Sequence, residues 1–277
     1  VACCPAQSVR IYPEYIRALF LHDRDDNVVL PVYGPCAAKF AAKDGTRVEI
    51  TEETLYPFDE TVVLRIKASA PWKRALRLKL PDWCKEYQVT INGTRATPAV
   101  AGGWLTVNET WRDDTLKIVF TMEPRVVAVK DAYFCGEPLR AIECGPLLFS
   151  LKYKEQWTSV PGTPLTPLPK EWSWFDVTCD GEPGFFSLRL GDLKDPSAIR
   201  KNRSPSDYPW EDSPIKLAVP MIRTQKHAYP CHFYAHKHTM MPYGNPVVPD
   251  EGARTETVEL VPFGCTTLRL TCFTVCR

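Results

Sequence analysis

Thr61-Val-Val-Leu-Arg-Ile-Lys67 and Ala75-Leu-Arg-Leu-Lys-Leu80 are two stretches in which apolar and charged residues alternate. Successive side chains of a β-strand point to opposite faces, so each stretch predicts a strand with one apolar and one charged face. Tyr87–Ile91 is followed by Asn92-Gly93, which predicts a hairpin because both turn residues tolerate a positive φ. Short strands separated by such turns indicate a β-sandwich.

Strand patterns continue over most of the chain, whereas a helical pattern occurs near its start. Apolar residues recur at near-helical spacing over residues 8–22, which predicts an amphipathic helix that tolerates Pro13 only near its start or at a kink. Further strands are expected at residues 46–56, 104–108, 116–121, 126–130, 146–153, 186–190, 215–221, 255–260 and 266–273. The predicted fold class is therefore mainly β, with two jelly-roll-like sandwiches after a short N-terminal helix.

The length and a change in composition indicate how these strands are divided. A chain of 277 residues is enough for one large domain or two of ordinary size. Four prolines lie between residues 161 and 169, close to three tryptophans, which is typical of a stiff loop at a domain boundary or of the start of a second sandwich. We expect residues 28–143 and 255–277 to form the first sandwich and residues 144–254 to form the second.

Charge and hydropathy exclude some classes of protein. The 34 Lys and Arg residues balance 33 Asp and Glu residues, whereas a nucleic-acid-binding surface normally brings a basic excess. Because no apolar run approaches 18 residues, we expect no membrane-spanning helix, and no signal peptide is visible. The chain starts in the middle of a motif, Val1-Ala-Cys-Cys-Pro5, so we expect it to be a piece of something longer.

Cysteines supply the first candidate site. Their number, 11, is odd, so a framework of disulfides cannot pair them all. Cys3 and Cys4 are adjacent, and their thiolates could both reach one metal ion; a helix N-terminus would also lower a thiol pKa. On the residues alone, two buried thiols remain the simpler interpretation of this pair. Four further cysteines in or beside predicted strands are expected to be buried thiols, namely Cys84, Cys144, Cys265 and Cys272.

A second candidate site lies between Cys231 and His238. Cys231, His232, His236 and His238 fall within eight residues, a density typical of metal sites. The flanking prolines nevertheless favour an extended, aromatic-rich loop. We therefore predict that these four side chains do not converge on one metal ion.

A series of short motifs extends over nearly the whole chain. They are Cys3-Cys-Pro-Ala-Gln-Ser-Val-Arg10, Thr51-Glu-Glu-Thr-Leu-Tyr-Pro-Phe-Asp59, Leu80-Pro-Asp-Trp-Cys84, Gly103-Trp-Leu-Thr106 with Trp111, Glu143-Cys-Gly-Pro-Leu147, Asp212-Ser-Pro-Ile215, Val261-Pro-Phe-Gly264 and Leu268-Arg269. In their order and spacing, these motifs resemble the C-terminal part of bacterial β-L-arabinofuranosidases of glycoside hydrolase family 127 (GH127). Gln7 stands where the family motif usually carries Asn.

The resemblance implies an (α/α)6-barrel catalytic domain followed by two β-sandwiches, the second inserted before the last strands of the first. Residues 1–27 would be the end of that barrel. By position, Cys3 would be the nucleophile and a Zn²⁺ ligand, and Cys4 a second ligand. The remaining ligands, one Glu and one Cys, and the acid/base Glu would lie upstream of this chain. Glu14, Glu52 and Glu53 are not in matching motif positions and receive no role.

The implied activity is retaining hydrolysis of non-reducing-end β-L-arabinofuranosides, with a thiolate in place of the usual carboxylate nucleophile. The expected partners are a carbohydrate substrate and the missing barrel, with no nucleic acid and no membrane; the oligomer stays open. The compartment also stays open, with the bacterial cytoplasm slightly favoured over secretion.

A different class of function is also compatible with the sequence. A non-catalytic carbohydrate-binding or assembly module would use exposed aromatic rings that stack on sugars. The tryptophans considered for this role are Trp157, Trp172, Trp174 and Trp210, for which packing in the core or between domains is the simpler interpretation.

Overall fold

The computed structural model describes residues 3–129, 139–160, 174–180, 185–189, 199–204, 208–209, 211–224 and 251–276. These residues are mainly β, with a single α-helix at the start, as the sequence predicts. The chain divides into two compact units, Val1–Met122 and Glu123–Arg277. None of the described helices is long and apolar enough to span a membrane.

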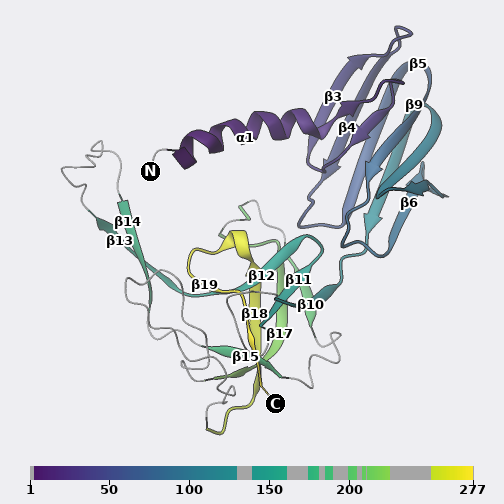
Figure 1. Cartoon of the computed structure of the whole chain (residues 1–277). Coiled ribbons are helices and arrows are strands. Elements are labelled where there is room, and N and C mark those ends of the chain that lie inside the picture. Colours follow the sequence, from purple (N-terminus) through teal and green to yellow (C-terminus); the bar gives the residue numbers. More distant parts are fainter. Residues whose placement is uncertain are drawn as a thin grey trace. The chain divides into compact units, whose positions relative to one another are not determined.

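The first unit consists of one helix and a nine-stranded sheet (Figure 1). The helix α1 covers Cys3–Leu19, and the strands are β1 (Leu21–His22), β2 (Val28–Leu30), β3 (Cys36–Ala41), β4 (Arg47–Thr54), β5 (Thr61–Lys79), β6 (Tyr87–Ile91), β7 (Thr94–Ala96), β8 (Ala99–Ala101) and β9 (Trp104–Phe120). The helix was predicted over residues 8–22; it begins earlier and continues through Pro13, which removes one backbone N–H donor.

Two long strands organise this unit. β5 and β9 pair antiparallel over most of their length, with an irregularity between Lys67 and Trp72. The first half of β5 also pairs with β4, and its second half pairs with β2. The two stretches that predicted the fold are therefore the two halves of one strand.

Apolar side chains of these strands fill the core of the first unit. Trp72 on β5 lies opposite Trp111 on β9, and both are fully buried. The other fully buried residues on the two strands are Val62, Leu64, Ile66, Leu76, Leu78, Leu105, Leu116, Ile118 and Phe120. The hairpin predicted at Asn92-Gly93 is confirmed, with φ values of 50° and 81° joining β6 to β7.

The second unit contains another nine-stranded sheet and a separate hairpin. Its strands are β10 (Pro124–Ala128), β11 (Arg140–Cys144), β12 (Leu147–Lys152), β15 (Phe186–Arg189), β16 (Arg200–Arg203), β17 (Ile215–Arg223), β18 (Thr255–Pro262), β19 (Arg269–Leu270) and β20 (Thr274–Cys276), and the hairpin pairs β13 (Glu155–Val160) with β14 (Trp174–Cys179). A short 3₁₀ helix, η3 (Phe263–Cys265), follows β18. The prediction of a single strand over residues 266–273 is therefore wrong, because only the two residues of β19 form a strand in that range.

The nested division of the two domains is also wrong. β18 pairs with β12 and β17, β19 with β12, and β20 with β15, so the C-terminal strands belong to the second unit. β10 and β11, which were expected in the first sandwich, join the same sheet. Alternation identifies a strand but not its partner, because apolar residues such as Leu260 and Leu270 can complete the buried face of either sheet.

Candidate functional site

The predicted nucleophile and metal ligand lie at the start of α1. The helix begins at Cys3, which places Cys3 and Cys4 together in its first turn. The dipole of a helix stabilises negative charge at this end, so it favours the thiolate form of a cysteine located there. The side chains of residues 1–8 lie outside the described part of the chain.

The opposite end of α1 is attached to the loop that precedes β3. Leu19 is buried, and the Tyr15 hydroxyl donates a hydrogen bond of 3.3 Å to the Tyr33 carbonyl oxygen. A Cβ atom added at Gly34 would lie 2.7 Å from the Tyr15 hydroxyl oxygen. Gly34 therefore allows a close approach of the tyrosine to the loop.

Between its two ends, α1 exposes large apolar side chains. Val9, Ile11, Tyr12 and Ile16 are 64–70% exposed. Helices of globular proteins usually bury such a stripe of apolar residues against another element. This exposed apolar surface of α1 is suited to contact with a further part of a protein.

A buried carboxyl group lies beneath the loop that holds α1. Glu52 on β4 is only 2% exposed. Its Oε1 accepts a hydrogen bond of 3.0 Å from the Gly34 N–H, and the Cys36 thiol donates to its Oε2 at 3.8 Å. Glu52 thus connects strand β4 to both ends of the loop segment 34–36.

Burial is the largest cause of the pKa shifts in this cluster. Desolvation raises the pKa of Glu52 to about 7, although the hydrogen bonds from Gly34 and Cys36 lower it. Burial, followed by the nearby carboxylate, raises the pKa of Cys36 to about 12. Desolvation also raises the pKa of Tyr15 and of Tyr33. Cys36 therefore stays protonated near neutral pH, whereas Glu52 titrates there.

The surroundings of Glu14, Glu52 and Glu53 differ, although the family resemblance implies a role for none of them. Glu14 and Glu53 are exposed and form ion pairs with Arg17 and Arg65. Glu52, in contrast, follows Val48 and Ile50 on the buried face of β4. The two-residue period of this strand was the sequence pattern that could have identified Glu52.

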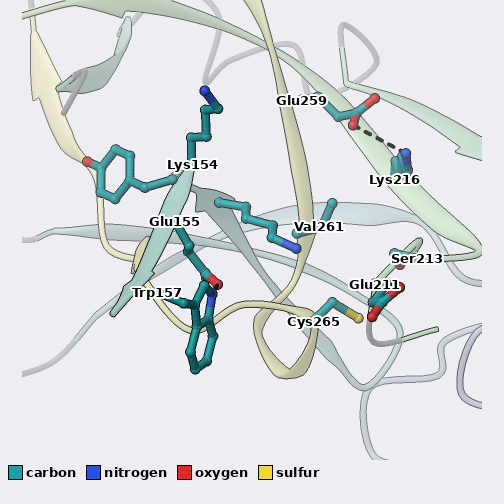
Figure 2. A pocket seen from close by; sticks show the side chains of 11 residues that line it. Lys154, Glu155, Trp157, Glu211, Ser213, Lys216, Glu259, Val261 and Cys265 are labelled. Atoms are coloured by element: carbon teal, nitrogen blue, oxygen red, sulfur yellow. Dashed lines mark hydrogen bonds and ion pairs between the residues drawn. The ribbon is translucent and has the colours of Figure 1, made fainter. Parts of the chain in front are cut away.

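The second unit contains a cavity of about 630 Å³ (Figure 2). Trp157 and Glu155 on β13 lie on one side of it in this view, and Glu211, Ser213 and Cys265 lie on the other. Trp157 is 54% exposed. Of the other tryptophans considered for sugar stacking, Trp172, Trp210 and the side chain of Trp174 lie outside the described residues.

In the described part of the chain, no group of three His, Cys, Asp or Glu side chains is arranged to hold a metal ion. Cys231, His232, His236 and His238 lie outside the described residues, so their prediction stays a prediction. Cys84, Cys144 and Cys265 are buried, as expected, whereas Cys272 is only partly buried.

Comparison with known proteins identifies the first unit. Residues 27–123 match the family model of the GH127 β-L-arabinofuranosidase middle domain. The chain carries the middle domain of the GH127 family. This confirms the resemblance inferred from the motifs, and the end of the match agrees with the boundary between the two units after Met122.

Solved structures share the fold of the whole chain. A GH127 β-L-arabinofuranosidase from Geobacillus stearothermophilus T6 superposes with a TM-score of 0.67 at 18% identity, over 99% of this chain and 37% of that one. A protein described as a glycoside hydrolase gives a TM-score of 0.66 at 15% identity, over 100% of this chain and 40% of that one. A GH127 β-arabinofuranosidase gives a TM-score of 0.62 at 16% identity, over 99% of this chain and 38% of that one. The chain thus spans less than half the length of these structures. No curated protein matches the sequence.

Proposed function

We propose that the chain is the C-terminal part of a retaining glycoside hydrolase that removes non-reducing-end β-L-arabinofuranosyl units, with Cys3 as the nucleophile. The observation that carries this proposal is the position of Cys3 and Cys4 in the first turn of α1, within a chain that contains a GH127 middle domain. The solved structures with the same fold include two that are named β-arabinofuranosidases, which supports the substrate class.

Two adjacent thiolates fit the donor set of a zinc site. Zinc in proteins prefers sulfur and nitrogen ligands in a tetrahedral arrangement, and two thiolates supply half of it. Cys3 and Cys4 would hold the ion together with one Glu and one Cys from an upstream domain. The chemistry that zinc supplies when bound is a thiol that remains ionised at neutral pH.

The proposed reaction has two steps. In the first, Cys3 Sγ attacks the anomeric carbon, a C–S bond forms, and the glycosidic C–O bond breaks as the upstream Glu protonates the leaving oxygen. In the second, the same Glu takes a proton from water, whose oxygen displaces the Cys3 sulfur from the anomeric carbon. The configuration of the sugar is retained because the carbon is inverted twice.

The exposed apolar surface of α1 supports the proposal that the catalytic domain contacts this helix. Val9, Ile11, Tyr12 and Ile16 would be buried if α1 were the last helix of an upstream helical barrel. The chain alone would then hold an incomplete site. We expect it to lack glycosidase activity for this reason.

Activity assays test the proposal on two proteins, the 277-residue chain and the longer polypeptide that includes an upstream catalytic domain. With a chromogenic β-L-arabinofuranoside, the chain should show no turnover, with or without added zinc. The longer polypeptide should turn the substrate over, and Cys3→Ala should lower its kcat by about 10³-fold or more. Cys179→Ala, which removes a partly buried thiol on β14, is the matched control and should retain activity. Turnover by the chain alone that survives Cys3→Ala would contradict both the role of Cys3 and the incompleteness of the site.

A further inference from the structure

The cavity in the second unit has the dimensions and chemistry of a small-ligand site. Its volume of about 630 Å³ lies within the range that is usual for pockets holding ligands of a few hundred daltons. It is formed by parts of the chain that are distant in sequence, including β12, β13, β17, β18 and η3. Its walls are therefore supported by the main sheet of the unit.

Trp157 presents an indole ring at this cavity in a fixed orientation. The indole N–H donates a hydrogen bond of 3.1 Å to Glu155 Oε2. Glu155 Oε1 in turn accepts the N–H groups of Thr267 and Leu268 at 3.0 and 3.1 Å. The ring is thus connected through one carboxylate to the backbone before β19, yet more than half of its surface remains exposed.

The β13–β14 hairpin places Trp157 and Glu155 on the same face. They are two residues apart on β13, and side chains two apart on a strand point to the same side. Trp157 pairs with Val177 of β14 in the hairpin register. An exposed aromatic side chain held by such contacts loses little conformational freedom when a ligand stacks on it.

Most charges around the cavity are already neutralised by protein partners. Lys154 forms an ion pair with Asp180, and Lys216 lies 3.2 Å from Asp212 and 3.5 Å from Glu259. Among the described residues, the Lys152 ammonium and the Glu211 carboxylate are the lining charges that form no hydrogen bond or ion pair. Both groups are exposed, so they can donate and accept hydrogen bonds with a ligand.

The balance of charge indicates a neutral ligand. Three lysines and three glutamates line the cavity, so their formal charges cancel. A phosphate or a uronic acid would be expected at a site with a cationic excess. A polyhydroxylated neutral molecule, in contrast, uses both cationic donors and carboxylate acceptors and presents C–H groups that stack on an indole.

We propose that the second unit binds a neutral oligosaccharide of about two or three sugar units in this cavity, with one sugar ring stacked on Trp157 and hydroxyl groups hydrogen-bonded to Lys152 and Glu211. The residues of this site belong to the second unit, whereas the proposed nucleophile Cys3 belongs to the first. The function of the site is to hold a glycan rather than to cleave it. The proposal does not depend on the catalytic one.

Isothermal titration calorimetry of the 277-residue chain tests this proposal directly. The probes are three neutral trisaccharides, α-1,5-arabinotriose, xylotriose and cellotriose, with tri-galacturonic acid as the anionic comparison. We expect at least one neutral trisaccharide to bind and tri-galacturonic acid to bind more weakly. Absence of binding by all three neutral probes, or tighter binding of the acidic one, would overturn the proposal.

Variants of the chain assign the binding to the cavity. Trp157→Ala should weaken the affinity about tenfold, which corresponds to about 1.4 kcal/mol for the loss of the stacked ring. Glu211→Gln and Lys152→Ala should each weaken it by a smaller factor of about 3–5, the usual effect of one exposed hydrogen bond. Tyr12→Ala removes an exposed aromatic ring of the first unit and should leave the affinity unchanged.

Thermal unfolding of each variant separates loss of binding from loss of fold. Trp157→Phe is the second variant for the case in which Trp157→Ala unfolds, because a phenyl ring retains part of the stacking surface without the N–H donor. Binding that is equal in the wild type, Trp157→Ala and Trp157→Phe would locate the sugar elsewhere and refute the proposed site. Because the readout is binding by the chain alone, inactivity of the longer polypeptide would leave this result unaffected.

Discussion

Glu52 Oε1 lies 3.0 Å from the backbone nitrogen of Gly34 and accepts its hydrogen bond. This contact joins the buried face of β4 to the loop on which Tyr15 of α1 rests. The hydrogen bonds from Gly34 and Cys36 offset only part of the cost of burying this carboxylate, so its pKa is raised to about 7. The attachment of the helix that carries Cys3 and Cys4 therefore contains a group that titrates near neutral pH.

We predict that Glu52→Gln stabilises the first unit at alkaline pH. The folded-state pKa of about 7 is above the reference value of 4.5, so the folded state binds the proton more tightly than the unfolded state. The contribution of Glu52 to stability is then greatest below pH 4.5 and falls as the pH rises towards and through 7, by about 3 kcal/mol in total. A glutamine is neutral at every pH and avoids this loss.

The measurement is chemical denaturation of both proteins at pH 5 and pH 8.5. The free energy of unfolding should be similar for the two proteins at pH 5 and higher for Glu52→Gln at pH 8.5. Glu53→Gln is the control: Glu53 is exposed and its pKa is lowered by Arg65, so this variant should gain no stability with rising pH. Equal pH profiles for wild type and Glu52→Gln would show that Glu52 is not buried as described.

Gly34→Ala should loosen the contact between the loop and α1. The new Cβ would meet the Tyr15 hydroxyl oxygen at 2.7 Å, so the tyrosine or the loop must shift. We expect a loss of about 1 kcal/mol, a typical effect of a moderate steric conflict. In the Tyr15→Phe background the hydroxyl group is absent. The atoms nearest to the new Cβ would then be in the Leu19 side chain, at 3.5 Å, and in the ring of residue 15, at 3.7 Å, which are ordinary contact distances.

A double-mutant cycle of Gly34→Ala and Tyr15→Phe measures this coupling through the free energies of unfolding. The cost of Gly34→Ala should be smaller when residue 15 is phenylalanine. If the two changes are additive, the close approach of Tyr15 to Gly34 does not determine the cost.

Parts of this architecture follow from local sequence, and others do not. The alternation from Val62 to Ile66 and from Leu76 to Leu80 predicted β5, and Asn92-Gly93 predicted the β6–β7 turn, because side-chain period and backbone φ are local properties. The partner of β18 was predicted wrongly, since pairing with β17 depends on contacts between residues far apart in the chain. The cavity around Trp157 was missed for the same reason: β12, β13 and β18 come together only in the folded unit.

Trp72→Phe and Trp111→Phe should differ in cost although both indoles are fully buried. Trp111 Nε1 donates a hydrogen bond of 2.9 Å to the Arg74 carbonyl oxygen, whereas Trp72 Nε1 has no acceptor among the described residues. Replacing Trp111 leaves that carbonyl without its donor, and replacing Trp72 removes an unsatisfied group. We expect Trp111→Phe to be more destabilising by about 1–2 kcal/mol, as measured by urea denaturation. The reverse order would contradict these hydrogen-bond assignments.

Zinc binding by the chain alone should be weak. Cys3 and Cys4 supply two of four ligands, and metal affinity falls steeply when a tetrahedral shell is incomplete. Competition with a chromogenic zinc chelator should give an affinity that falls further in the Cys3→Ala/Cys4→Ala double variant. Tight one-to-one binding that is unchanged in the double variant would place the metal on other residues.

Peptide mass mapping after acid quenching can show whether Cys3 is the nucleophile of a glycosidase. The longer polypeptide would be mixed with a β-L-arabinofuranoside that carries a good leaving group and quenched during turnover. We predict a pentosyl adduct on the peptide that contains Cys3 and no such adduct in the Cys3→Ala variant, which should also be inactive. An adduct on a carboxylate residue, or turnover with an adduct that persists after Cys3→Ala, would exclude Cys3 as the nucleophile.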